Sequence, residues 1–324
     1  MIKKKFYYGI DWLRAFACIG IVLMHIRANS NYHILGRFYN IFIPSLTNFV
    51  YLFMAISAFG MCSGYFDKVM NGSINWTDFY KKRYTRILPF FGFLVILDVL
   101  ISCNINSLLE GITELTLLHG FIPQELSVIG VGWYLGTVFV FYIIFPFFCV
   151  LIENKKRAWF SFIISVILHY VCVYQFYLDR HNIIFSLCYF LAGGIVYLYR
   201  KDLSKISYRY YIILVLLTTT IYYLFDTNDL VLIVLVVLLL SLAITTDINE
   251  NKIISFVSGI SMEIYLSHMM LFRVCEKLHM NTLFGDGLFQ YIITSNFVIF
   301  GCIIFSVLTK KLINKIEKDL VKVR

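Results

Sequence analysis

Residues 131–152 read VGWYLGTVFVFYIIFPFFCVLI, a run of 22 residues without a charged side chain. A helix needs about 20 mostly apolar residues to cross the hydrocarbon core of a bilayer. The run is long enough to do so, and it therefore predicts a transmembrane helix.

Runs of this kind recur along the chain of 324 residues, of which 60% are apolar and 15% charged. A soluble domain carries about 25% charged residues, so the composition excludes an ordinary soluble protein and a disordered chain. We therefore predict an all-α fold, a polytopic integral membrane helical bundle of about ten transmembrane helices, with 1–324 as a single domain and no fused soluble domain. The expected spans cover residues 9–28, 41–62, 88–104, 131–152, 158–174, 182–199, 210–225, 229–246, 253–272 and 289–309.

Lysine and arginine residues are unevenly divided between the segments that join these spans. Segments expected on one side hold 22 of the 28, those on the other side hold 5, and Arg14 lies inside the first span. This is the positive-inside pattern, and it predicts a multi-pass protein of the cell (plasma) membrane with both termini in the cytoplasm. The net charge of +9 is then mostly a topology signal. We expect contacts with membrane lipids and no nucleic-acid partner.

The first span has one competing interpretation. Three lysines at residues 3–5 precede an apolar run, as they do in a cleaved secretory signal. Asp11 and Arg14 lie between the lysines and that run, which favours an uncleaved helix.

Residues 105–127 form the one long segment expected on the outer side. Leucine and isoleucine recur there at helical spacing, with Glu110 and Glu114 on another face. Such an amphipathic helix is expected to lie in the membrane interface, where it would roof an outward-facing cavity.

Ionisable side chains within spans are costly to bury, so each is a candidate site residue. Arg14 and His25 are eleven residues apart, which is about 20° past three helical turns and about 16 Å along the axis. Both side chains therefore point along one face of the first helix. The alternative is that each reaches out to the nearer headgroups, and spacing alone does not separate the two.

The ninth span carries Glu263 near its middle and His268 near the outer level of His25. Glu263 is a candidate partner for Arg14 or for an imidazole. The competing interpretation of His268 is a buried histidine that is hydrogen-bonded to the backbone. Asp98 in the third span has no partner that the sequence identifies.

Five short motifs, taken together and in this order, resemble the membrane acyltransferase-3 family. They are DWLRAFA at residues 11–17 with an arginine, ten residues and then a histidine at His25; LFMAISAF at residues 52–59; KRYTRILP at residues 82–89; WYL at residues 133–135 with Tyr142 and Pro146; and SMEIYLSH at residues 261–268. Two positions depart from the family pattern: Ala58 replaces a glycine, and Val138 stands where many members carry a glutamate, so no acidic role is carried over to it.

This resemblance implies an O-acetyltransferase that moves an acetyl group from cytoplasmic acetyl-CoA to a hydroxyl of an extracytoplasmic or lipid-linked glycan of the cell envelope. A hydroxyl that attacks a thioester needs a base, and histidine is the usual one. His25 is expected to be that base or a transient acyl carrier. No metal is expected, and a separate partner protein is expected if transfer needs a second component.

The expected site residues fall into three groups. The catalytic candidates are His25, Arg14, Glu263 and His268. The candidates for binding coenzyme A are Arg14, Arg83, Arg86 and Lys82, because arginine forks and lysine point charges bind phosphate. Lys82 has a competing interpretation, as a positive charge that only sets the membrane topology. The candidates for binding the acceptor are Asp11, Ser57, Trp133, Tyr134 and Tyr265.

A proton-coupled transporter or a flippase of a lipid-linked sugar would also bury arginine, histidine and carboxylate side chains. Many transporter folds, however, show interrupted helices at corresponding places in two halves. The sequence has no such pair of Gly/Pro-interrupted segments, which favours the enzyme.

Overall fold

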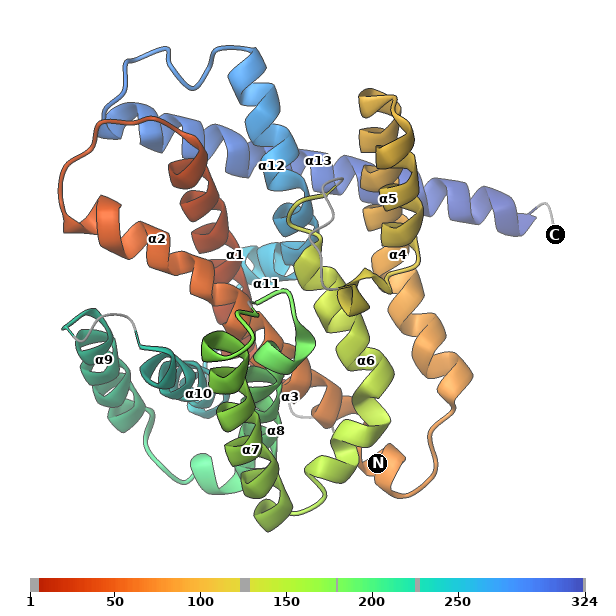
Figure 1. Ribbon diagram of the computed structural model, residues 1–324, viewed down its shortest axis with the longest axis vertical. Coiled ribbons are helices and arrows are strands. Elements are labelled where there is room, and N and C mark those ends of the chain that lie inside the picture. The colour runs from red at the N-terminus through yellow and green to blue at the C-terminus, as the bar shows by residue number, and fades with distance from the viewer. Residues whose placement is uncertain (1–5, 123–128, 179, 225–227, 323–324) are drawn as a thin grey trace.

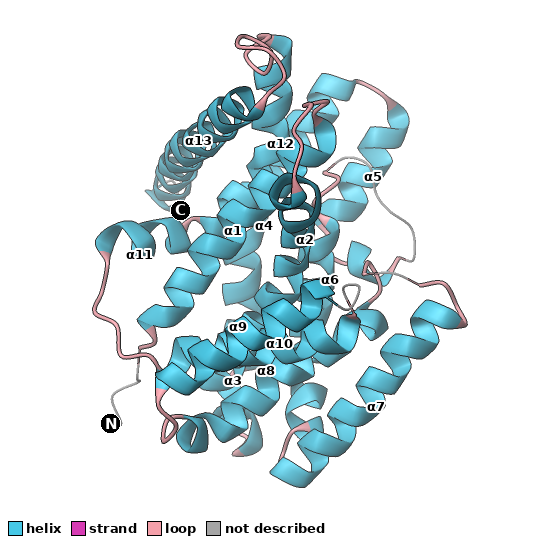
Figure 2. Cartoon of the chain, turned by 90° about the vertical axis from the view of Figure 1, so that its left-hand side faces the viewer, coloured by secondary structure: helices cyan, strands magenta, loops and turns pink. Residues whose placement is uncertain are grey.

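The computed structural model describes residues 6–122, 129–178, 180–224 and 228–322, and within these ranges the chain consists of helices joined by loops, with no strand (Figures 1 and 2). The helices are α1 (Tyr8–Asn29), η1 (Phe38–Phe42), α2 (Ile43–Ser45), η2 (Leu46–Asn48), α3 (Phe49–Met70), α4 (Trp76–Ser102), α5 (Ile105–Leu115), η3 (His119–Phe121), α6 (Trp133–Leu151), α7 (Lys155–Tyr174), α8 (Ile183–Leu203), α9 (Tyr208–Leu224), α10 (Asp229–Thr245), α11 (Lys252–Gly259), α12 (Ser261–Lys277) and α13 (Leu288–Lys322).

The fold is an all-α polytopic membrane bundle, and each predicted span coincides with one or more helices to within about two residues at its ends. Residue 225 lies outside the described residues. Seven helices among the described residues are long and apolar enough to cross a membrane, or eight if α11 and α12 form one bent span. Helices α9 and α10 have 17 residues each. They are therefore about 25 Å long, slightly less than the roughly 30 Å of a bilayer core.

Glycines allow the central helices to approach closely. A Cβ atom added to Gly193 of α8 would lie 2.1 Å from the carbonyl oxygen of Ala55 on α3, and one added to Gly9 of α1 would lie 2.1 Å from that of Ala243 on α10. Small residues at helix crossings bring backbones together in membrane proteins. Helix α1 thereby packs between α3, α10, α11, α12 and α13 in the middle of the bundle.

Helix α4 begins twelve residues before the predicted span at residue 88. The side chain of Asn75 caps it by accepting a hydrogen bond from the backbone N–H of Asp78 at 3.1 Å. Its 27 residues make it about 40 Å long. The extra turns carry Arg83 and Arg86 as part of the helix.

Helix α5 is amphipathic, as predicted, and none of its residues lines either of the two cavities described below. It packs antiparallel to the end of α4 (Figure 1), where a Cβ atom on Gly111 would come within 2.7 Å of Val99 and 3.2 Å of Val95. Its opposite face leaves Leu108 and Ile112 exposed. Because Gly111 has no side chain, α5 can pack directly against α4. Residues 123–127 of the predicted segment lie outside the described residues.

The predicted span 253–272 is broken. Helices α11 and α12 meet at an angle of 67°, with Ile260 between them. Polar groups satisfy the backbone at the break: the Oγ of Ser261 donates to the carbonyl of Ser258 at 2.8 Å, and the Nζ of Lys310 donates to the carbonyl of Gly259 at 3.3 Å. Within a membrane, such freed carbonyls must find partners in the protein.

Candidate active site

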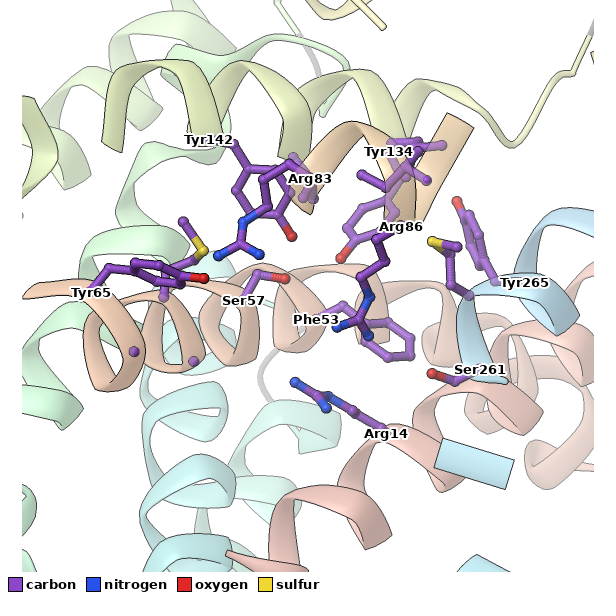
Figure 3. A pocket seen from close by; sticks show the side chains of 17 residues that line it. Arg14, Phe53, Ser57, Tyr65, Arg83, Arg86, Tyr134, Tyr142, Ser261 and Tyr265 are labelled. Atoms are coloured by element: carbon purple, nitrogen blue, oxygen red, sulfur yellow. The ribbon is translucent and has the colours of Figure 1, made fainter. Parts of the chain in front are cut away.

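A cavity of about 320 Å³ lies among helices α1, α3, α4, α6 and α12 (Figure 3). Its size is at the lower end of the range of ligand-binding pockets. Six of the residues predicted for the site line it: Arg14, Ser57, Arg83, Arg86, Tyr134 and Tyr265.

Three arginines bring positive charge to this cavity. Figure 3 shows Arg86 extending from α4 toward Arg14, which rises from α1 on the opposite wall. The two guanidinium groups are close enough to repel each other, and Gly60 of α3 leaves room beside the Nη2 of Arg14. Arginine side chains that converge in a membrane protein need anionic partners. The cavity is therefore suited to an anionic ligand.

Aromatic rings hold Arg83 in place. Its Cζ lies 4.8 Å from the ring centre of Tyr65, 5.0 Å from that of Phe79 and 5.4 Å from that of Tyr142. Such cation–π contacts each stabilise by about 0.5–1 kcal/mol, or more when desolvated. The Nε of Arg83 is buried without a hydrogen-bond partner among the described residues. The cage fixes a guanidinium fork at the wall of the cavity.

Hydroxyl groups line the cavity near α12. Ser57 is hydrogen-bonded to the hydroxyl of Tyr134, and the rings of Tyr134 and Tyr265 meet edge to face, with centroids 5.4 Å apart. The hydroxyl of Tyr265 donates to the carbonyl of Val131 at 3.0 Å. These contacts join α3, α6 and α12 at one end of the cavity.

Two histidines lie just beyond that end. The rings of His25 and His268 have centroids 4.9 Å apart, so the predicted common level of the two is confirmed. His268 is fully buried, and its Nδ1 lies 2.5 Å from the carbonyl oxygen of Tyr265. A carbonyl only accepts, so Nδ1 carries the proton of the neutral ring and Nε2 is left as an acceptor. That Nε2 has no hydrogen-bond partner in the described part of the chain.

Tyr265 therefore connects the arginine cavity to the histidine pair. Its side chain lines the cavity, and its carbonyl sets the tautomer of His268, one helical turn further along α12. A group held at the Tyr265 end of the cavity would be next to two imidazoles. The arrangement therefore brings the binding site for an anionic ligand next to a possible proton acceptor, an imidazole.

Four of the predicted site residues lie elsewhere. Glu263 pairs with the Nζ of Lys310 at 2.6 Å, not with Arg14 or an imidazole, because α13 passes along this face of α12. The two oxygens of Asp11 accept hydrogen bonds from Ser258 and Ser255 of α11.

Trp133 and Lys82 also lie outside the lining of the cavity. Trp133 stands beside Arg180, whose Cζ is 5.1 Å from the ring centre, and Lys82 is exposed on α4. Asp98 lies near the end of α4 and accepts a hydrogen bond from Ser102 at 3.4 Å.

Sequence reasoning missed Lys310 and Arg180. Lys310 is the first of six basic residues after the last predicted span, so it was counted only as a topology charge. Arg180 is the one arginine or lysine in residues 175–181. A single cation in a segment expected on the outer side was the feature of the sequence that could have marked it as a site residue. Within the described ranges, no cluster of three or more His, Cys, Asp and Glu side chains is placed to hold a metal ion.

A family model described as an acyltransferase domain, that of acyltransferase-3, matches residues 7–310. No curated protein and no solved structure matches the chain. The match covers all six of the predicted residues that line the cavity, and both histidines.

Proposed function

Since the chain belongs to the acyltransferase-3 family, and is therefore a membrane acyltransferase, we propose that it is an O-acetyltransferase. The proposed donor is acetyl-CoA from the cytoplasm. The proposed acceptor is a hydroxyl of an extracytoplasmic or lipid-linked glycan of the cell envelope.

The observation that carries this proposal is the continuity between three arginines and two histidines. Arg14, Arg83 and Arg86 line one cavity, and its Tyr265 end touches the His25–His268 pair. Coenzyme A carries several phosphate charges, for which arginine forks are the suited partners. The cavity supports a site in which the arginines bind the phosphates and the thioester arm extends toward the histidines.

The proposed chemistry needs one proton acceptor and one stabiliser of negative charge. When a hydroxyl attacks the thioester carbonyl, its oxygen bonds to the acetyl carbon and its proton passes to His25. The carbon–sulfur bond then breaks, and coenzyme A leaves as a thiol after its thiolate takes the proton from His25. Arg14, which lines the arginine cavity, is proposed to balance the negative charge of the bound donor. We propose that His268 positions the imidazole of His25 through the contact between the two rings, whose centroids are 4.9 Å apart. An attack by His25 itself, with acetyl passing through the imidazole, is the second form of this proposal.

We propose the plasma membrane as the location, with both termini in the cytoplasm, because basic residues are concentrated in the segments on that side. In this orientation Arg83 and Arg86 lie toward the cytoplasm, where acetyl-CoA is made, and the histidines lie toward the outer side. A separate partner protein would deliver the acceptor or receive the acetyl group if a second component is needed.

The main alternative is a transporter of a lipid-linked sugar. Transporter folds built on repeats show discontinuous helices at corresponding positions in two halves. Among the described residues there is one such bent pair, α11 and α12. This asymmetry favours the enzyme.

Thermal unfolding of the purified protein with added coenzyme A separates the two functions. A ligand that binds only the folded protein stabilises it by about 2.7 kcal/mol at a hundred times its Kd, so the enzyme should unfold at a clearly higher temperature. Arg14→Gln should lose this shift, and Lys82→Gln, which changes an exposed charge outside the cavity, should keep it. No shift in the wild-type protein at millimolar coenzyme A would contradict the proposal.

A further inference from the structure

A second cavity, of about 200 Å³, lies between the start of the second span and helices α9 and α10. One wall is formed by η1, α2, η2 and the first turn of α3, and the other by α9 and α10. No residue lines both this cavity and the arginine cavity. The two are therefore separate compartments of one bundle.

The polar groups of the second cavity gather at one end. The hydroxyls of Ser45 and Tyr223 lie 2.6 Å apart, and the Nδ2 of Asn48 donates to the hydroxyl of Tyr222 at 2.7 Å. One to two turns further along the helices, the lining is apolar apart from Thr219; it consists there of Leu52, Leu235, Val236 and Leu239. A ligand that fits this lining has a polar end and a hydrocarbon end.

The cavity belongs to a part of the bundle that faces lipid. Helix α9 leaves Ile213, Leu216 and Leu217 exposed, and it lies at the left edge of the molecule in Figure 1, the side that faces the viewer in Figure 2. Exposed apolar side chains on a membrane helix contact lipid chains. Lipid hydrocarbon chains therefore surround this part of the bundle, and a hydrocarbon chain matches the apolar end of the cavity.

Arg180 lies next to η2, which forms part of the wall at the polar end. The Nη1 of Arg180 donates to the Oγ1 of Thr47 at 2.8 Å, and the neighbours of Thr47 on each side, Leu46 and Asn48, both line the second cavity. The guanidinium also lies 5.1 Å from the ring centre of Trp133. Arginine held in this way is suited to phosphate.

Arg180 also lies close to the histidine site. Its charge acts directly on both His25 and Tyr265. The guanidinium therefore lies close both to a wall of the second cavity, through Thr47, and to the place where the reaction is proposed. A molecule with a hydrocarbon chain in the cavity and a phosphate at Arg180 would present its next group to His25.

We propose that the second cavity holds the hydrocarbon chain of a lipid-linked sugar acceptor, with the phosphate at Arg180 and the sugar hydroxyl at His25. This inference rests on the proposed function and chooses the lipid-linked class from the two acceptor classes given there. It assigns Arg180 to recognition of the acceptor, whereas the arginines of the other cavity bind the donor.

The test uses the full chain in phosphatidylcholine vesicles and a prenyl diphosphate that carries a diazirine on its chain. After irradiation, peptides that contain residues 219–239 should carry the label, and an excess of unlabelled prenyl diphosphate should remove it. Arg180→Gln should reduce labelling by about tenfold, as expected for loss of hydrogen bonds to a charged group. Val236→Phe should reduce it as well, because Val236 is 2% exposed and lines the cavity.

Matched variants control for general effects. Val234→Phe adds the same bulk to a position of α10 that is 50% exposed, and Arg273→Gln removes a cation outside both cavities; both should label as the wild type does. Leu235→Phe, at a half-buried lining position, replaces Val236→Phe if the latter does not fold. The inference would be overturned if Arg180→Gln were labelled as strongly as the wild type, or if excess unlabelled prenyl diphosphate did not reduce the labelling. Either result would indicate that the cavity holds an ordinary bilayer lipid. Stabilisation by coenzyme A in the same preparations reports on the proposed function independently.

Discussion

His25 of α1 and His268 of α12 lie in ring contact, with centroids 4.9 Å apart, and the carbonyl of Tyr265 accepts a hydrogen bond from the Nδ1 of His268. The proton on Nδ1 leaves the Nε2 of His268 as an acceptor, and this atom has no hydrogen-bond partner among the described residues. Because Tyr265 also lines the arginine cavity, one turn of α12 connects the proposed ligand-binding site with the histidines proposed to take part in proton transfer.

Replacing Arg86 by lysine should weaken binding of coenzyme A by about tenfold even though the charge is kept. Lysine cannot form the two parallel hydrogen bonds of an arginine fork with phosphate. Isothermal titration of the purified protein measures this, with Lys82→Arg as the control. Equal affinity in Arg86→Lys and wild-type protein would remove Arg86 from the donor site.

Radiolabelled acetyl-CoA should distinguish the two proposed roles of His25. If His25 is a base, protein incubated without an acceptor should retain no label after denaturation, because no covalent bond forms. If the imidazole carries the acetyl group, label should remain until hydroxylamine releases it, and it should be absent from His25→Gln. Stable label in His25→Gln would place the covalent step on another residue.

The ion pair between Glu263 and Lys310 should matter for stability more than for chemistry. Breaking a buried pair leaves an uncompensated charge and lowers the free energy of unfolding by about 3–5 kcal/mol. Because the side chain of Lys310 is 39% exposed, we expect Glu263→Gln to lower the free energy of unfolding by less, about 1–3 kcal/mol. Thermal unfolding in detergent measures the loss. The double variant with Lys310→Met should recover part of it, and a fully additive effect would show that the two side chains are not coupled.

Glu114 should make stability depend on pH. Burial raises the pKa of its carboxyl to about 8, from an ordinary value of 4.5, so the folded protein holds a proton that the unfolded chain releases above pH 4.5. The contribution to stability is therefore fully present below pH 4.5 and declines as the pH rises to about 8. Glu114→Gln should unfold at a temperature that changes less between pH 6 and pH 8. An unchanged slope would contradict the buried protonated state.

Hydropathy and helical geometry predicted much of this fold. Each span was visible as an apolar run, and the eleven-residue spacing of Arg14 and His25 placed both on one side of α1, where the structure finds the cavity and the second histidine. These features are local, because they depend only on the period of one helix.

Features set by contacts between distant helices were not predictable. The partner of Glu263 is on α13, and no spacing within α12 indicates how α13 passes beside it. The break at Ile260 depends on hydrogen bonds from Ser261 and Lys310 rather than on a proline. The aromatic cage of Arg83 likewise draws its rings from three helices.

The central claim is that acetyl transfer depends on the histidine beside the arginine cavity. The most direct measurement is mass analysis of envelope glycans and lipid-linked sugars from cells that lack the gene and carry either the wild-type protein or His25→Ala, with membrane levels of the protein matched. General base catalysis contributes about 10²–10⁴-fold to rate. We therefore predict acetylated species with the wild type and none with His25→Ala, while both purified proteins still bind coenzyme A. Acetylation at the wild-type level with His25→Ala would contradict the account.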